Sequence, residues 1–522
     1  MRIERTKNAT RNMFYGVLQK MNTTIAPFII RTAMIHFMGV QYLGLNGLFA
    51  SVLSVLNLAE LGVGSAMVYS MYKPIVEDDS ETICALMRLY RTYYRLIGLF
   101  IGVIGVCLTP FIPKLISGAV PVGLNIYVLY LMNLSATVFS YWLFAYRNCL
   151  FSAHQRGDIT SKIAIITEII KYACQLYVII VFHNYYIFLL VALSTQVLSN
   201  ILTALASLKM FPDYKPEGGL ETITVKQINH RIADLFTSKI GTVVVNSVDT
   251  IVISAFLGLS ILGIYQNYFH IMQSVIAMIG IVFSACTAGI GNSIIVESRA
   301  KNYNDLKKLT FIISWLSGFC VCCFACLYQP FMELWVGKEL MLNYSAVFCL
   351  CVYFYVFEIN RLLNTYKDAS GIWHEDRFRP LATAGANLVM NLIMVNYWGI
   401  YGIILSTVLS MLIVGMPWLI YNLFSTVFDR EYLLDYVYQV LKYAIVALCI
   451  GIITYVLSSF VKGALIIELI IKSFICIIIP NILYWIIYRN KKEYKQMLLI
   501  IERITHGRIV FKRNNDRQKH RQ

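Results

Sequence analysis

The sequence repeats MGVQYLG at residues 38–44 as LGLSILG at residues 257–263, so that Gly39 matches Gly258, 219 positions later. Two later matches keep this register to within one residue: Pro110 with Pro330, and Gly118 with Gly337. The matches lie in or beside apolar runs, and they indicate two homologous halves. A membrane protein made of two repeated halves is typical of transporters whose site lies between the halves.

The composition indicates a membrane protein. Hydrophobic residues make up 58% of the 522 residues and charged residues only 14%, whereas a soluble protein carries about a quarter charged residues. Apolar runs of roughly 20 residues, the length that crosses a bilayer as a helix, recur along the whole chain. A water-soluble globular protein is therefore excluded.

The apolar runs predict fourteen spans and an all-α fold. Sustained alternation of apolar and polar residues, which a membrane β-barrel requires, is absent from the sequence. The first span follows four basic residues and has no small-residue cleavage site, so we expect a retained helix rather than a signal peptide. The predicted spans are 13–37, 43–70, 96–116, 124–146, 160–182, 185–208, 231–257, 261–294, 309–330, 341–366, 380–397, 400–424, 437–460 and 464–488.

The distribution of Lys and Arg gives an independent test of this number of spans. With a cytoplasmic N-terminus, and with Lys114, Lys162 and Arg231 at the edges of their spans counted with the adjoining loops, the cytoplasmic segments carry 34 basic residues and the outer loops carry three. This asymmetry follows the positive-inside rule, and one missed span would invert it. We therefore expect a multi-pass protein of the bacterial inner or plasma membrane with both termini in the cytoplasm. The net charge of +16 then lies mainly on the cytoplasmic side of the membrane. We therefore expect no nucleic-acid binding.

The repeat also predicts the domain organisation. The seventh span comes six spans after the first, an even number, so both halves enter the membrane in the same direction, related by an axis along the membrane normal. We expect two six-helix repeats around a central cavity, two additional helices, and a basic cytoplasmic tail that contacts anionic membrane lipids. The predicted boundaries are 1–218, 219–428, 429–488 and 489–522.

Several short segments resemble polysaccharide-lipid flippases of the Wzx type, in the superfamily that includes MATE exporters and lipid II flippases. The segments are VDTIVISAFLG (248–258) followed by LGIY (262–265), NLVMNL (387–392), YWGIYG (397–402) followed by Ser406 and Thr407, and ELGVG (60–64). The resemblance runs over most of residues 10–425. It implies a V-shaped bundle that moves a polyprenyl-pyrophosphate-linked oligosaccharide to the outer leaflet by alternating access, with other polysaccharide-assembly proteins as possible partners. The C-terminal helix pair departs from the twelve-helix MATE plan.

Ionisable residues inside the spans mark the candidate site, because a charge in the bilayer needs a partner, a wet cavity or an interface. Glu168 with Lys171, and Glu358 with Arg361, are each three residues apart and can neutralise one another on one helix face. Near helix ends, a lysine can extend its side chain to the interface; Lys20, Lys442 and Lys472 are of this kind.

Three charges are harder to explain in this way. Arg31 has no acid on its own helix, and Lys239 and Asp249 lie deep in the seventh span, too far apart to pair. Cationic side chains suit a pyrophosphate that must shed part of its hydration. We predict a substrate-binding site made of Arg31, Lys239, Arg361, Lys171, Asn387 and Asn391, with Tyr265, Asn267 and Tyr268 as further candidates for contact with the glycan. Asp249 or Glu60 would couple a proton or Na⁺ to transport, although the Asn residues can equally serve as hydrogen bonds between helices.

Other chemistries find little support in the sequence. The chain has no phosphate-binding loop of the G-x-x-x-x-G-K-[ST] type, so we expect neither ATP hydrolysis nor a cofactor. Four cysteines between 320 and 326 lie inside an apolar span and indicate buried packing rather than a metal site. We do not expect an enzyme. Two alternatives stay open: a cation-coupled drug exporter of the MATE type, which favours an acidic cavity, and a membrane polysaccharide polymerase or ligase, which needs a large outer loop.

Overall fold

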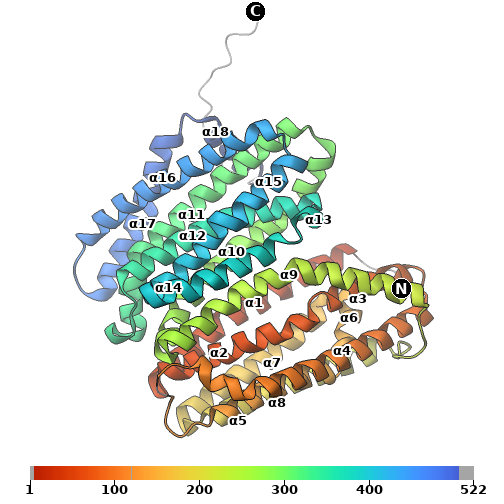
Figure 1. The fold of residues 1–522 in the computed structure, drawn as a ribbon. Coiled ribbons are helices and arrows are strands. Elements are labelled where there is room, and N and C mark those ends of the chain that lie inside the picture. Colours follow the sequence, from red (N-terminus) through yellow and green to blue (C-terminus); the bar gives the residue numbers. More distant parts are fainter. Residues whose placement is uncertain (1–4, 119, 505–522) are drawn as a thin grey trace, which may run out of the picture. The chain divides into compact units, whose positions relative to one another are not determined.

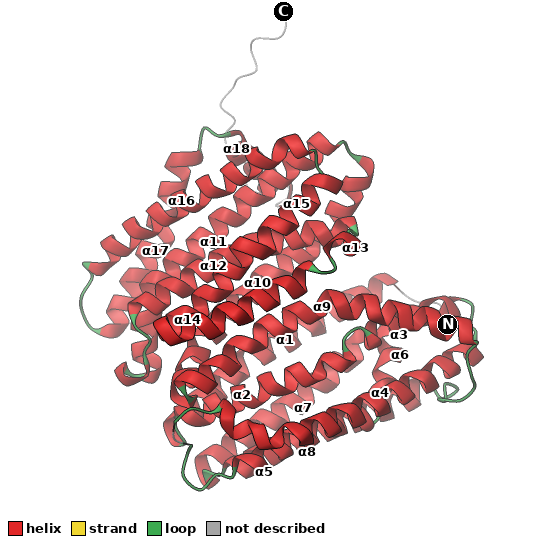
Figure 2. Ribbon diagram, viewed as in Figure 1, coloured by secondary structure: helices red, strands yellow, loops and turns green. Residues whose placement is uncertain are grey.

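A computed structural model describes residues 5–118 and 120–504, and throughout these ranges the ordered elements are helices, with no strand (Figure 2). Ten helical stretches of the described chain are long and apolar enough to cross a membrane, or eleven if the bent pair Ile126–Trp142 and Ala145–Ala153 counts as one span. The predicted fold class, a polytopic helical membrane bundle, is confirmed.

Each of the fourteen predicted spans coincides with helical structure (Figure 1). The helices in question are α1 (Arg5–Phe37), α2 (Val40–Leu56) with α3 (Val63–Val76), α4 (Ser80–Leu108), α5 (Ile126–Trp142), α7 (Gly157–Tyr177), α8 (Tyr185–Met210), α9 (Thr222–Leu257), α10 (Leu259–Val296), α11 (Arg299–Val336), α12 (Tyr344–Ser370), α14 (Arg379–Ser410) with α15 (Met416–Thr426), α16 (Leu433–Ser459) and α17 (Leu465–Tyr488). Three shorter helices complete the fold: α6 (Asn148–Ala153), α13 (Trp373–Asp376) and α18 (Lys492–Ile504).

The stretch Trp373–Thr426 contains two of the predicted spans. It has 54 residues, or roughly 80 Å of helix at 1.5 Å per residue, whereas the hydrocarbon core is about 30 Å thick. Gly399 divides it, because φ of 54° and ψ of −129° are not helical and are accessible mainly to glycine. The predicted break between spans 380–397 and 400–424 therefore coincides with a backbone conformation that only this residue type adopts readily.

The helices pack as two compact units. The first unit comprises Met1–Ser274 and Asp376–Ser410, and the second comprises Val275–Glu375 and Met411–Gln522. In the first, α1 packs along α7 and α9 along α14. In the second, α11 is the central helix and contacts α12, α16 and α17. The repeat boundary at residues 218 and 219 stays a prediction.

Positions matched by the repeat have matching backbone conformations. Gly39 and Gly258 both have positive φ, 113° and 87°, just before α2 and α10 begin. Within the first unit the starts of these two helices also touch reciprocally. A Cβ atom at Gly44 would overlap the backbone carbonyl of Leu259, and a Cβ at Gly263 would overlap that of Val40. Both pairs, Gly44 with Gly263 and Val40 with Leu259, are 219 positions apart.

Candidate functional site

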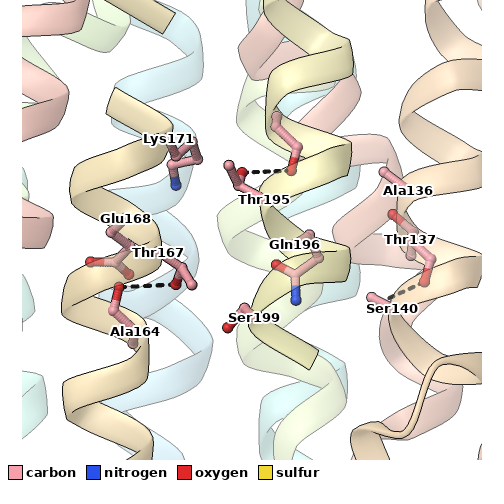
Figure 3. A pocket seen from close by; sticks show the side chains of 11 residues that line it. Ala136, Thr137, Ser140, Ala164, Thr167, Glu168, Lys171, Thr195, Gln196 and Ser199 are labelled. Atoms are coloured by element: carbon pink, nitrogen blue, oxygen red, sulfur yellow. Dashed lines mark hydrogen bonds between the residues drawn. The ribbon is translucent and has the colours of Figure 1, made fainter. Parts of the chain in front are cut away.

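The first unit contains a polar cavity of about 500 Å³ between α5, α7 and α8 (Figure 3). Each helix contributes one stripe of small, hydroxyl or amide side chains spaced three or four residues apart, which is the spacing of neighbours on one helix face. One acid and one base are among them. The lining residues are Ala136, Thr137 and Ser140 on α5, Ala164, Thr167, Glu168 and Lys171 on α7, and Ala192, Thr195, Gln196 and Ser199 on α8.

Some of the hydroxyl groups in this cavity are engaged by their own helices. Thr167 donates to the carbonyl of Ile163 at 2.9 Å, and Thr195 donates to that of Val191 at 2.8 Å. A hydroxyl that donates in this way keeps acceptor capacity. Together with the carboxylate of Glu168, the wall can therefore receive hydrogen bonds from a hydroxyl-bearing ligand.

A second cavity of about 280 Å³ shares Lys171 and Ala192 with the first. It is lined by α1, α2, α5, α7 and α8, and its polar residues are Arg31, Asn46, Asn133, Lys171, Tyr172 and Gln175. Arg31 and Lys171, two of the predicted substrate-binding residues, lie 140 positions apart in the sequence and line the same cavity.

Lys171 and Glu168 are not in direct contact. Among the described residues, Lys171 makes no ion pair within 4.0 Å, and its Nζ lies 4.3 Å from the ring centroid of Tyr172. Glu168 instead accepts a hydrogen bond of 2.9 Å from Asn22 Nδ2 on α1. Arg31 has a long hydrogen bond, 3.5 Å from its Nη1 to Asn267 Oδ1. The expected pairing within α7 is therefore absent, and a cation is left facing the cavity.

Arg361 belongs to the second unit, where the expected pairing with Glu358 does form. Its Nη1 lies 3.7 Å from Glu358 Oε1 and donates a 2.6 Å hydrogen bond to the carbonyl of Ile276. The guanidinium also lies over the ring of Phe283 at 5.3 Å. The convergence of Arg361 with Arg31 on one cavity stays a prediction, and the side chain of Lys239 lies outside the described part of the structure.

Asp249 on α9 is the centre of a buried hydrogen-bond network in the first unit. Its carboxylate accepts from Asn391 Nδ2 at 2.7 Å and from Thr407 Oγ1 at 2.8 Å, both on α14. Asn387 donates to Thr407 Oγ1 at 2.9 Å, and Ser406 donates to Asn391 Oδ1 at 2.7 Å. Three segments that lie far apart in the sequence, around residues 249, 387–392 and 406–407, therefore meet at the carboxylate of Asp249. Both donors are neutral, and no cation pairs with Asp249 among the described residues.

Four other predicted residues do not line these cavities. Glu60 follows α2 in a short 3-10 turn and accepts a hydrogen bond of 3.0 Å from the hydroxyl of Tyr94. Tyr265 and Tyr268, like Asn267, are buried and line neither cavity. The described residues contain no group of three or more His, Cys, Asp or Glu side chains that could hold a metal. The described cysteines are free thiols.

No protein-family model matches the sequence, and no curated protein matches it either. Solved structures do match. One is the lipid II flippase MurJ in an inward closed conformation, with a TM-score of 0.65 and 14% identity over 92% of this chain and 99% of that chain. Another is an inward-facing multidrug resistance MATE family transporter of the MOP superfamily, with a TM-score of 0.57 and 15% identity over 76% of this chain and 94% of that chain. A mutant of the Vibrio cholerae MATE transporter VcmN gives 0.53 and 13%, over 80% and 96%. At these identities the similarity shows the fold.

Proposed function

We propose that this protein moves a polyprenyl-pyrophosphate-linked oligosaccharide from the inner to the outer leaflet of a bacterial plasma membrane by alternating access. The observation that carries the proposal is the joint lining of one cavity by Arg31 and Lys171, next to a cavity of hydroxyl and amide groups. The fold shared with MurJ, described as a lipid II flippase, supports it.

The two cavities suit the two polar parts of such a substrate. A diphosphate that leaves water needs donors in place of its hydration shell, and Arg and Lys supply charge-assisted hydrogen bonds. Lys171 is available for this role because its Nζ makes no direct ion pair among the described residues and lines the cavity. The sugars bind in the larger cavity, where hydroxyl and amide groups donate and accept. The polyprenyl chain stays in the apolar part of the bilayer.

Asp249 is our candidate for ion coupling, with Glu60 as the second. A partly buried carboxylate whose donors are all neutral is unfavourable while it is charged. Uptake of a proton or of Na⁺ removes the uncompensated charge, and it changes what Asn391 and Thr407 can bond to. Ion binding at Asp249 would in this way alter the packing of α14 on α9.

A deletion strain tests the proposal. We expect lipid-linked oligosaccharide to accumulate in the inner leaflet and the surface polysaccharide to be lost. The wild-type gene should restore export, whereas Lys171→Ala should restore it poorly, because loss of a charge-assisted contact worth roughly 1.5–3 kcal/mol slows transport about tenfold or more. Lys442→Ala is the matched control, since this lysine is exposed and lines neither cavity.

The outcomes separate the alternatives. Normal surface polysaccharide in a strain without a redundant flippase, together with altered drug susceptibility, would identify a MATE-type exporter instead. Export of single repeat units without long polymer would identify a polymerase or ligase. Equal export by Lys171→Ala and Lys442→Ala at equal protein abundance would remove Lys171 from the site but leave the proposed substrate standing.

A further inference from the structure

The second unit buries an unusual set of polar atoms without hydrogen-bond partners. Among the residues that the structure describes, nine such atoms belong to α11 and the helices that contact it, and three of the nine are on Glu358 and Asn360 of α12. The other six are the hydroxyls of Ser314 and Ser317 on α11, Tyr355 on α12, and Tyr484 and Tyr488 on α17, and the amide oxygen of Gln439 on α16. Isolated polar atoms without partners are rare in protein interiors, so a group of six on adjoining helices needs a common explanation.

Several of these atoms lie against the same face of α11. A Cβ atom at Gly318 would overlap the hydroxyl oxygen of Tyr484, so that hydroxyl rests on the α11 backbone one turn from Ser314. The Tyr484 ring is stacked on Trp315 with centroids 5.1 Å apart and planes inclined by 21°. The Tyr355 hydroxyl lies close to the hydroxyl of Ser314.

The cluster of hydroxyl groups continues along the next turn of α17. Tyr488 follows Tyr484 by four residues, and their rings are stacked at 6.2 Å. Both pack with Tyr443 of α16 and Phe311 of α11 in one buried cluster. Ser314 and Ser317 also lie on the helix face that begins with Thr310, whose hydroxyl is 3.3 Å from that of Tyr436. Hydroxyl groups from four helices therefore meet around α11.

We propose that this part of the second unit holds a cluster of ordered water molecules bound by Ser314, Tyr355 and Tyr484, and extending toward Tyr488. Buried water forms about three hydrogen bonds with polar atoms that have no other partner, and three hydroxyl groups from three helices provide them. The water joins α17, one of the two helices predicted to lie outside both repeats, to α11 and α12. Apolar side chains gain little from leaving lipid for protein, so polar contacts position this attachment. The indole of Trp315 on α11 donates directly to Asn481 Oδ1 on α17 at 3.0 Å, and the water adds to that contact.

Radiolytic hydroxyl labelling of the purified full-length protein, read by mass spectrometry, tests for the water directly. Radicals form from bound water in place, so Tyr484 should be oxidised although only 2% of its surface is exposed. Tyr130 is the matched control, because it is fully buried and its hydroxyl donates to the carbonyl of Gly105 at 3.1 Å. Labelling of Tyr484 no greater than that of Tyr130 would overturn the proposal.

Thermal unfolding of Tyr484→Phe and Ser314→Ala gives a second test, because a site with water and a dry site predict opposite changes in the melting temperature. If the hydroxyls hold water, each substitution removes a hydrogen bond from the cluster, and the melting temperature should fall. If the site is dry, each substitution removes a polar atom that was buried without a partner, and the melting temperature should stay the same or rise. Unchanged or higher values for both variants would therefore contradict a water cluster. Neither test depends on the transported substrate.

Discussion

Substitution of Asp249 separates a structural role of this carboxylate from a role in ion coupling. Its oxygens accept hydrogen bonds from Asn391 at 2.7 Å and Thr407 at 2.8 Å. In Asp249→Ala both donors lose their acceptor, and a buried donor without a partner costs about 1–3 kcal/mol. We expect Asp249→Ala to lower the free energy of unfolding by roughly 2–6 kcal/mol, twice the cost of one orphaned donor.

Asp249→Asn should be much less damaging to stability. Its amide oxygen can accept from Asn391 as before. Its new amide group can donate to Thr407, whose hydroxyl then turns to the carbonyl of Ile403, 3.4 Å away. One hydrogen bond is exchanged rather than lost, so the expected cost is about 1 kcal/mol or less. The carboxylate charge is removed, however, and with it the capacity to bind a proton or Na⁺.

Two measurements on the same purified variants complete the test. Thermal unfolding compares the stabilities, and translocation in vesicles is followed under imposed proton or Na⁺ gradients. We expect one of the gradients to accelerate the wild type and to have no effect on Asp249→Asn, while Glu60→Gln serves as the comparison for the second candidate. Equal destabilisation by the two Asp249 substitutions would refute the hydrogen-bond reasoning. A stable Asp249→Asn variant that still responds to the gradient would refute the coupling role.

Three further predictions concern other parts of the chain. Arg361→Ala leaves the fully buried Glu358 without its ion-pair partner and should cost about 3–5 kcal/mol of stability. Adding Glu358→Gln to this variant should restore most of the lost stability in thermal unfolding. Failure to do so would show that Arg361 acts mainly through its other contacts. Gly44→Ala places a methyl group on the Leu259 carbonyl and should destabilise the protein more than an alanine at Gly289, where no atom lies within 4 Å of the added carbon. A reporter fused after Gln522 should be active only in the cytoplasm, and external activity would invalidate the predicted topology.

The fold class could be predicted from the sequence because two independent signals, the apolar runs and the distribution of basic residues, extend over the whole chain. Apolar runs long enough to cross a bilayer locate the helices, and the basic loops constrain their number independently. Even the short turn at Gly399 was placed correctly, since the runs on either side of it are each long enough to span. What the runs do not determine is which helices pack as one unit: residues 376–410 belong with the first unit, a long-range pairing that no local pattern records.

The candidate site was predictable only in part. The motif residues around Asp249 were identified through a family resemblance, and the structure brings them together in one network. The polar stripes on α5, α7 and α8 were visible as hydroxyl and small residues at helical spacing, but such stripes look the same when they only mediate helix packing. For Lys472 the structure differs from the interpretation of the sequence. Its place near a helix end suggested an extended side chain, whereas it is buried and paired with Glu468 at 2.5 Å.

The reciprocal contact between the starts of α2 and α10 bears on the ancestry of the chain. In a twofold dimer of identical six-helix subunits, the contact of one glycine with the partner's backbone occurs twice by symmetry. Gly44 on Leu259 and Gly263 on Val40 have this relation inside a single polypeptide, as expected after duplication and fusion of a gene for such a subunit. In such a dimer every mutation occurs in both copies and changes both contacts at once. Fusion removes that constraint, so one contact can loosen while its counterpart stays tight, and the two halves become free to diverge in what they bind.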